Sequence, residues 1–356
     1  MTLSKRGTTF KRFFLSLLFA AAVSLALAFA AQWSIRQMVG EQRIELKEFY
    51  VFAAVSAGIL FLFTVRPANR PMRFFKNIGR LLLILILILV AAVWGYAFFW
   101  VAQNAFLYPP VPANQQAEEA LKAMPHAEQL PIPGGDGAQY NGWLIKNGQE
   151  KAGLLLYFGG NGEEAAGRAQ SFARLMADNK LPGYHVLTAD YPGTGHSGGE
   201  RSEETIYAMA QATWEYITKR PEVNPEKMVL AGWSLGTGTA IRLAGEKNPA
   251  GLILFAPYFN GGELANSFAE KLFETDIPVP LPIRNPYRSN QYARNVQAKT
   301  LVVAARDDKL VPYEQSQRLA ALLPQGQLVT LESGGHNAMW NDQISLQAVH
   351  QFLGGL

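Results

Sequence analysis

The chain has 356 residues, with 32 Lys and Arg against 28 Asp and Glu, and it contains no cysteine. The absence of cysteine excludes disulfides, thiolate metal sites and cysteine nucleophiles together. Residues 1–103 carry 12 basic and 3 acidic side chains, and residues 104–356 carry the remaining 20 and 25. The basic surplus therefore accompanies an apolar N-terminal third, and it does not predict a nucleic-acid partner.

Three apolar segments in residues 1–103 are typical of transmembrane helices. Residues 13–33 and 81–101 each run for 21 residues without a charged side chain, and residues 49–65 run for 17. A helix of about 20 such residues crosses a hydrocarbon core of about 30 Å. No Asp, Glu, Lys, Arg or His lies within the three segments, so we expect a membrane anchor rather than a transport path.

The charges of the connecting loops predict the orientation of these segments. Residues 1–12 and 66–80 carry Lys and Arg without an acidic residue, whereas residues 34–48 carry both signs. Cytoplasmic loops hold the excess of Lys and Arg. The sequence thus predicts an integral membrane protein, with everything after about residue 104 on the periplasmic side of a bacterial inner membrane. Cleavage of the first segment as a signal peptide would leave that placement unchanged.

From residue 141 onward, short apolar runs alternate with amphipathic stretches. This alternation is typical of a mostly parallel α/β sheet with helices on both faces. Residues 104–140 are interpreted as a linker and an initial β-hairpin, and residues 259–298 as a lid-like insert in a domain of residues 141–356. The predicted strands are 142–145, 153–158, 185–189, 228–232, 251–255, 300–304 and 327–331.

The segment Gly232-Trp233-Ser234-Leu235-Gly236 is a Gly-x-Ser-x-Gly motif. Such a motif places a serine on a sharp turn between a strand and a helix, and its small flanking residues let neighbouring backbone pass closely. Here it falls between a predicted strand and an apolar helix, which favours Ser234 as a nucleophile. The alternative role for Ser234 is that of a helix N-cap.

A serine hydroxyl needs a general base and an acid that orients it. His336 follows the last predicted strand and is the candidate base. Asp307 and Asp308 both follow a strand between the serine and the histidine, so both satisfy the order Ser, Asp, His. The remaining histidines are interpreted as surface or packing residues: His126, His185, His196 and His350.

The glycine-rich loop Phe158-Gly159-Gly160-Asn161-Gly162 follows a predicted strand and precedes a helix. Its backbone N–H groups, together with that of Leu235, are candidates for an oxyanion hole. Gly160 and Asn161 are both candidates for the donor from the loop. A phosphate-binding loop is the alternative, and it is disfavoured because the Gly-Lys-Ser/Thr ending and the ribose-binding acid are missing.

The chain resembles the α/β-hydrolase superfamily, in particular its serine-aminopeptidase-like, Abhydrolase-type branch with an N-terminal membrane anchor. The resemblance is carried by the motifs above, by the loop Asp190–Gly199 and by the run Asp308-Lys309-Leu310-Val311-Pro312. The resemblance covers about residues 105–356 and implies an α/β-hydrolase fold. It implies that Asp308 is the acid beside Ser234 and His336, because the family acid commonly begins an Asp-x-x-Val-Pro run. It also implies acyl transfer without a metal or cofactor.

The leading functional prediction is a membrane-anchored serine hydrolase that cleaves carboxylic esters, with a small-molecule or lipid acyl ester as substrate. A peptidase or amidase would use the same triad. A non-catalytic membrane-anchored binding protein on a hydrolase scaffold is a third alternative, disfavoured because all three chemical types of the triad are present. We expect the 259–298 insert, rather than the triad, to determine the substrate.

Overall fold

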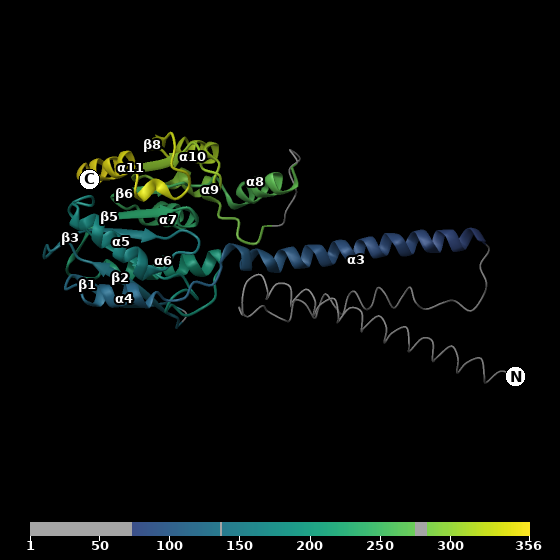
Figure 1. The fold of residues 1–356 in the computed structure, drawn as a ribbon, viewed down its shortest axis with the longest axis horizontal. Helices are drawn as coiled ribbons and strands as arrows, with labels where there is room; N and C mark the ends of the chain where they lie inside the picture. Colours follow the sequence, from purple (N-terminus) through teal and green to yellow (C-terminus); the bar gives the residue numbers. More distant parts are fainter. Residues whose placement is uncertain (1–72, 136, 275–282) are drawn as a thin grey trace. The chain divides into compact units, whose positions relative to one another are not determined.

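The computed structural model describes residues 73–135, 137–274 and 283–356 of a chain that divides into two units, 1–107 and 108–356 (Figure 1). In the first unit, α3 (Arg73–Leu107) is a single helix of 35 residues and contains the apolar segment 81–101. Among the residues that the structure describes, no helix qualifies as a membrane span. The apolar segments 13–33 and 49–65 lie outside the described residues.

The unit 108–356 is built on one eight-stranded sheet in the order β1-β2-β4-β3-β5-β6-β7-β8. β1 pairs antiparallel with β2, and β2 pairs antiparallel with β4. The other five pairings are parallel, so the expected mostly parallel sheet is confirmed. The strands are β1 (Ala127–Pro133), β2 (Gln139–Ile145), β3 (Ala152–Phe158), β4 (Tyr184–Ala189), β5 (Val223–Trp233), β6 (Gly251–Phe255), β7 (Lys299–Ala305) and β8 (Gly326–Leu331).

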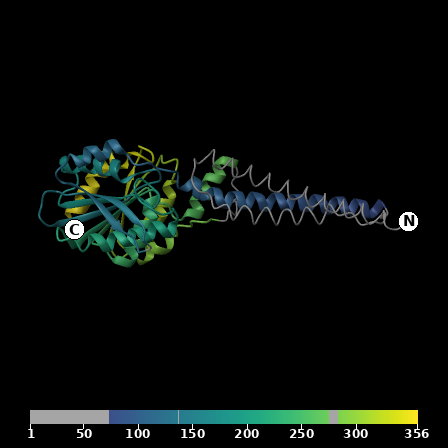
Figure 2. The same ribbon diagram turned by 90° about the horizontal axis from the view of Figure 1, so that it is seen from below.

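Helices cover both faces of this sheet (Figure 2). On one face, α5 (Ala165–Ala177) and α11 (Gln343–Gly354) contribute side chains to the same core cluster as Tyr157 and Phe255. α6 (Glu203–Ile217) and α7 (Leu235–Lys247) contact each other on the opposite face. Because both faces are covered, every residue of the apolar strand β3 is buried.

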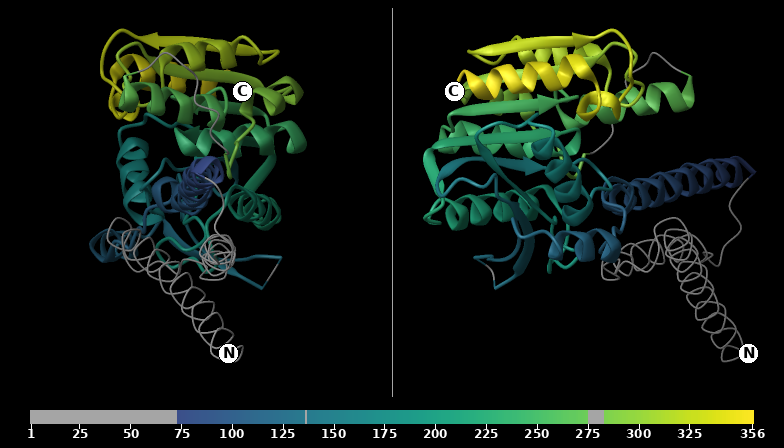
Figure 3. Two further views of the ribbon diagram at one scale, coloured as in Figure 1. Left: turned by 90° about the vertical axis from the view of Figure 1, so that its right-hand side faces the viewer. Right: turned by 60° about the vertical axis from the view of Figure 1, so that its left-hand side comes forward.

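Side chains cap several of these helices where the sequence provides an acceptor. Ser202 Oγ accepts the N–H of Thr205 at the start of α6, and Asp342 Oδ1 accepts the N–H of Ser345 at the start of α11. Such caps satisfy N–H groups that have no partner within the first turn of a helix. Helix α10 (Tyr313–Ala320) follows β7. Strand β8 forms the edge of the sheet opposite β1 (Figure 3).

Two regions contain elements beyond the linker and hairpin and beyond the one helix, near residues 263–273, that the sequence indicates. Residues 104–140 hold the end of α3, strand β1 and a short helix, α4 (Gln115–Lys122), which begins where Asn114 Oδ1 accepts the N–H of Ala117 at 3.1 Å. Residues 259–298 hold α8 (Gly261–Phe273), α9 (Ser289–Tyr292) and the 3₁₀ turn Ala293–Asn295, and residues 275–282 lie outside the described part of the chain.

Candidate active site

Ser234 lies on the turn between β5 and α7, at the carboxyl end of a central strand. Its backbone has φ 50° and ψ −117°, a conformation that is strained for any residue with a Cβ atom. The turn is held because Ser234 N–H donates to the carbonyl of Phe255 at 2.9 Å. Gly236 passes close to β3, and a Cβ atom at that position would collide with the carbonyl oxygen of Phe158. The close approach to β3 therefore requires a glycine at position 236, and the turn holds Ser234 in a strained backbone conformation.

The side chain of Ser234 does not cap α7. Instead, Ser234 Oγ lies 2.9 Å from His336 Nε2, and His336 Nδ1 lies 2.7 Å from Asp308 Oδ2. The His336 side chain is 10% exposed and that of Asp308 is 2% exposed. Three residues that the sequence places 102 and 28 positions apart are thus joined in one chain of hydrogen bonds.

The two neighbouring aspartates have different partners. Asp308 Oδ1 accepts the N–H groups of Leu310 at 2.8 Å and Val311 at 2.9 Å, which leaves Oδ2 to face the imidazole. Asp307 instead accepts the N–H groups of Gly335 at 2.8 Å and Gly334 at 3.1 Å. These two bonds lower the pKa of the Asp307 carboxyl. Asp308 therefore contacts the histidine directly, and Asp307 holds the loop that carries it.

The other histidines have separate environments. His185 is buried in β4, where Nδ1 accepts the N–H of Asn147 at 3.1 Å, and burial lowers its pKa. His196 Nε2 lies 2.7 Å from Glu118 Oε1. Within the described part of the chain, His336 is the histidine that hydrogen-bonds to Ser234.

The two candidate donors from the glycine-rich loop differ in their hydrogen bonding. The N–H of Gly160 already donates to Glu163 Oε2 at 2.8 Å. Across the described residues, the N–H groups of Asn161 and Leu235 donate to no protein acceptor. Of the three predicted donors, Asn161 and Leu235 are therefore the two whose N–H groups are available to a substrate oxygen.

Trp233 and Glu163 contact this site and were not singled out by sequence reasoning. Trp233 Nε1 donates to the carbonyl of His336 at 3.2 Å, and the two rings lie 5.4 Å apart between centroids. The Gly-x-Ser-x-Gly motif leaves the residue before the serine unspecified, so the sequence contains no signal for this contact. Glu163 follows the glycine-rich loop, and its spacing alone does not reveal which N–H group it accepts.

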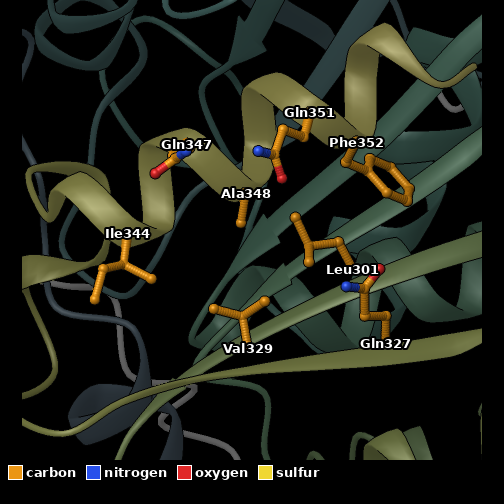
Figure 4. A pocket seen from close by; sticks show the side chains of 8 residues that line it. All are labelled: Leu301, Gln327, Val329, Ile344, Gln347, Ala348, Gln351 and Phe352. Atoms are coloured by element: carbon orange, nitrogen blue, oxygen red, sulfur yellow. The ribbon is translucent and has the colours of Figure 1, made fainter.

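A separate hollow of about 440 Å³ lies between α11 and the last two strands of the sheet (Figure 4). None of the side chains that line it is titratable or nucleophilic, so it offers no group for acid–base or covalent catalysis. They are Leu301, Gln327, Val329, Ile344, Gln347, Ala348, Gln351 and Phe352.

Family models and known structures agree with this architecture. The model of the serine aminopeptidase family S33 matches residues 149–278, and that of the TAP-like proteins matches residues 275–354. The esterase Pf2001 of Pyrococcus furiosus superposes with a TM-score of 0.54 at 19% identity, covering 70% of this chain and 98% of that one. The chain has the α/β-hydrolase fold.

Two curated proteins are similar to this chain in sequence over part of their length. An uncharacterized protein of Mycobacterium tuberculosis is 27% identical over 260 residues, which cover 72% of this chain and 89% of that one. The lysophosphatidylserine lipase ABHD12 of Danio rerio is 29% identical over 198 residues, which cover 51% of this chain and 50% of that one. The matched region thus spans only half of the lipase.

The strained conformation of Ser234 gives a stability prediction. A glycine adopts positive φ without a steric cost, whereas serine and alanine do not. We expect Ser234→Gly to be more stable than Ser234→Ala by about 1 kcal/mol, or about 2–4 °C in unfolding midpoint for a unit of this size. Thermal unfolding of the two full-length variants in the same detergent tests this, and equal midpoints would contradict the strain.

Proposed function

We propose that this chain is a serine hydrolase that cleaves carboxylic esters through a covalent acyl-enzyme. The observation that carries the proposal is the chain of hydrogen bonds from Ser234 Oγ through the imidazole of His336 to Asp308. It lies at the carboxyl ends of β5, β7 and β8, where functional side chains of open α/β sheets gather. The N–H groups of Asn161 and Leu235, which have no acceptor among the residues that the structure describes, complete the set that acyl transfer requires.

The reaction begins when His336 Nε2 removes the proton of Ser234 Oγ as that oxygen attacks the ester carbonyl. The N–H groups of Asn161 and Leu235 stabilise the oxyanion that forms. When the tetrahedral intermediate collapses, His336 returns the proton to the leaving alcohol. Water, activated by the same imidazole, then releases the acid from Ser234. Asp308 holds His336 in the tautomer with Nε2 unprotonated and stabilises the imidazolium.

This geometry disfavours a non-catalytic binding protein on a retained scaffold. Each member of the triad is placed by its own backbone contacts, and Ser234 is held in a strained conformation that a binding role would not need. A peptidase or amidase remains a second candidate, because the family model that matches residues 149–278 is that of serine aminopeptidases.

The ester and amide readings are separated by matched chromogenic substrates. We expect p-nitrophenyl esters of increasing acyl length to be hydrolysed with kcat/KM at least about 10³-fold higher than the corresponding p-nitroanilides, a difference of about 4 kcal/mol in activation free energy. Ser234→Ala serves as the blank for both series. If aminoacyl p-nitroanilides are hydrolysed faster than the esters, a peptidase becomes the favoured function. The ester with the highest kcat/KM would give the size of the acyl site.

We extend the proposal to an integral membrane enzyme whose unit 108–356 lies on the periplasmic side. The three apolar segments and their basic flanks support this placement. Seven of the ten large apolar side chains that are exposed in the described residues belong to α3: Leu82, Ile84, Leu85, Leu87, Ile88, Leu89 and Tyr96. A row of exposed apolar side chains on one helix needs a nonpolar environment, and a bilayer supplies it next to a lipid acyl substrate.

Membrane extraction tests the anchor. We expect the full-length protein to stay in the membrane pellet after alkaline carbonate washing and to dissolve only in detergent, because peripheral proteins lose their electrostatic attachment under those conditions. Protease added to spheroplasts should degrade the 108–356 unit. Release into the carbonate supernatant would contradict the anchor, and full protection from protease would contradict the orientation.

A further inference from the structure

The carboxylate of Glu163 joins the glycine-rich loop to the core of the sheet. Oε2 accepts both the N–H of Gly160 at 2.8 Å and the hydroxyl of Tyr157 at 2.8 Å, and Oε1 forms an ion pair with Arg168. The side chains of Glu163 and Arg168 are only 15% and 18% exposed. A largely buried carboxylate with three partners is held in a fixed position, unlike a solvated surface charge.

The loop is held tightly on its other sides as well. Tyr191 donates its hydroxyl to the carbonyl of Gly159 at 2.7 Å. A Cβ atom on Gly160 would lie 2.6 Å from the ring of Trp233, and one on Gly159 would lie 3.0 Å from Glu163 Oε2. The two glycines therefore fit between Trp233 and Glu163 with no room for a side chain, and the peptide between them is fixed at both its carbonyl and its N–H end.

The bond from Gly160 to Glu163 determines which N–H group of the loop can bind a substrate oxygen. The Glu163 carboxylate takes the N–H of Gly160, so this group is not free to bind a substrate oxygen. The next N–H along the chain, that of Asn161, has no acceptor within the described residues. Because Glu163 fixes the N–H of Gly160, it also sets the position of the next N–H in the chain, that of Asn161.

We propose that Glu163 is a positioning residue of the oxyanion hole. Its carboxylate fixes Gly160, and this presents the N–H of Asn161, beside that of Leu235, to the oxyanion of the tetrahedral intermediate. The inference rests on the proposed hydrolase function. Glu163 touches no reacting atom; it acts through the geometry of the loop, whose donors stabilise charge that exists only in the transition state.

Glu163→Ala should therefore lower kcat by about 10- to 100-fold, less than the loss of a whole donor, because the N–H of Asn161 is displaced rather than removed. KM should change by less than about threefold, since the ground-state carbonyl interacts weakly with the hole. The inhibition constant of a trifluoromethyl ketone, which forms a tetrahedral oxyanion adduct with the serine, should rise by the same factor as kcat falls. These constants are measured on the full-length protein in detergent, with Ser234→Ala as blank.

The neighbouring carboxylate provides a matched control. Glu164 accepts the N–H groups of Ala166 and Gly167 at the start of α5 and does not bond to the loop. Glu164→Ala should lower the unfolding midpoint while leaving the ratio of the ketone inhibition constant to KM unchanged. If Glu163→Ala behaves in this same way, or keeps wild-type kcat and ketone affinity, the positioning role is wrong.

Two further outcomes are distinguishable. If the wild-type protein shows no hydrolysis that depends on Ser234, the proposed hydrolase function fails. That outcome is distinct from a failure of the Glu163 proposal, in which the wild type is active and Glu163→Ala is as active as the wild type. If Glu163→Ala does not fold, Glu163→Gln decides, because its amide oxygen still accepts the N–H of Gly160 while the ion pair with Arg168 is lost. Because that bond is kept, we expect the ketone inhibition constant of Glu163→Gln to stay within about threefold of the wild-type value, and a rise of about 10-fold or more would overturn the proposal.

Discussion

Replacing Ser234 with alanine should lower kcat for the preferred p-nitrophenyl ester by about 10⁵- to 10⁶-fold, with little change in KM. The substitution removes one oxygen, which lies 2.9 Å from His336 Nε2 and is the only hydroxyl in the proposed triad. Without it, no acyl-enzyme forms. Residual turnover would come from water attacking a substrate that the N–H groups of Asn161 and Leu235 still polarise. Steady-state kinetics over a range of ester concentrations measures the effect.

The same experiment has an internal test of cooperation. His336→Ala should cost about as much as Ser234→Ala, and the double variant should cost no more than either, because residues that act as one unit are not additive. Ser171→Ala is a suitable control, since its hydroxyl donates to the carbonyl of Gly167 within α5. Multiplying losses in the double variant would mean that Ser234 and His336 act independently.

The second large effect is expected for Asp308→Asn, which should lower kcat by about 10⁴-fold. The reason lies in the backbone around it. The N–H groups of Leu310 and Val311 require an oxygen at the Oδ1 position, so the amide nitrogen of asparagine must take the Oδ2 position that faces His336 Nδ1. An N–H there favours the tautomer in which Nε2 carries the proton, and that nitrogen cannot accept the proton of the serine.

Asp307→Asn provides the matched comparison. Gly334 and Gly335 donate to different oxygens of Asp307, so an asparagine keeps one of the two bonds, and we expect kcat to fall by less than about 10-fold. The lowered pKa of Asp307 means that its stabilisation of the loop is present above the unfolded pKa and is lost as pH falls through the lower folded value. The loop therefore stays held at neutral pH. A larger loss for Asp307→Asn than for Asp308→Asn would reverse the assignment of the two aspartates.

Much of the fold could be predicted because local and global signals agree. Strands such as β3 and β7 are short apolar runs, which a sheet covered on both faces requires, and their ends agree with the predicted ranges to within a residue or two. α4 was missed because Gln115–Lys122 is short and mostly polar, so its periodicity is weak and its start depends on the cap from Asn114.

Two features of the candidate site depend on side-chain and backbone contacts that the order of residues does not reveal. The order of residues was sufficient to select Ser234 and His336, but it could not separate Asp307 from Asp308, since both follow the same strand. The family resemblance favoured Asp308, and the structure shows the physical difference: Asp308 contacts the imidazole of His336, whereas Asp307 binds the N–H groups of the loop before that histidine. The donor register in the glycine-rich loop was open for the same reason, because the orientation of each N–H group depends on where the side chain of Glu163 reaches.

The most direct test of the account is to treat the full-length protein in detergent with a fluorophosphonate probe and to locate the modified residue by mass spectrometry of the digested protein. We predict one adduct, on Ser234, formed by the wild type and abolished by Ser234→Ala. Asp308→Asn should slow its formation strongly, because the imidazole is held in the wrong tautomer. An adduct on another serine, or a folded wild type that forms none, would contradict the proposal that Ser234 is an activated nucleophile.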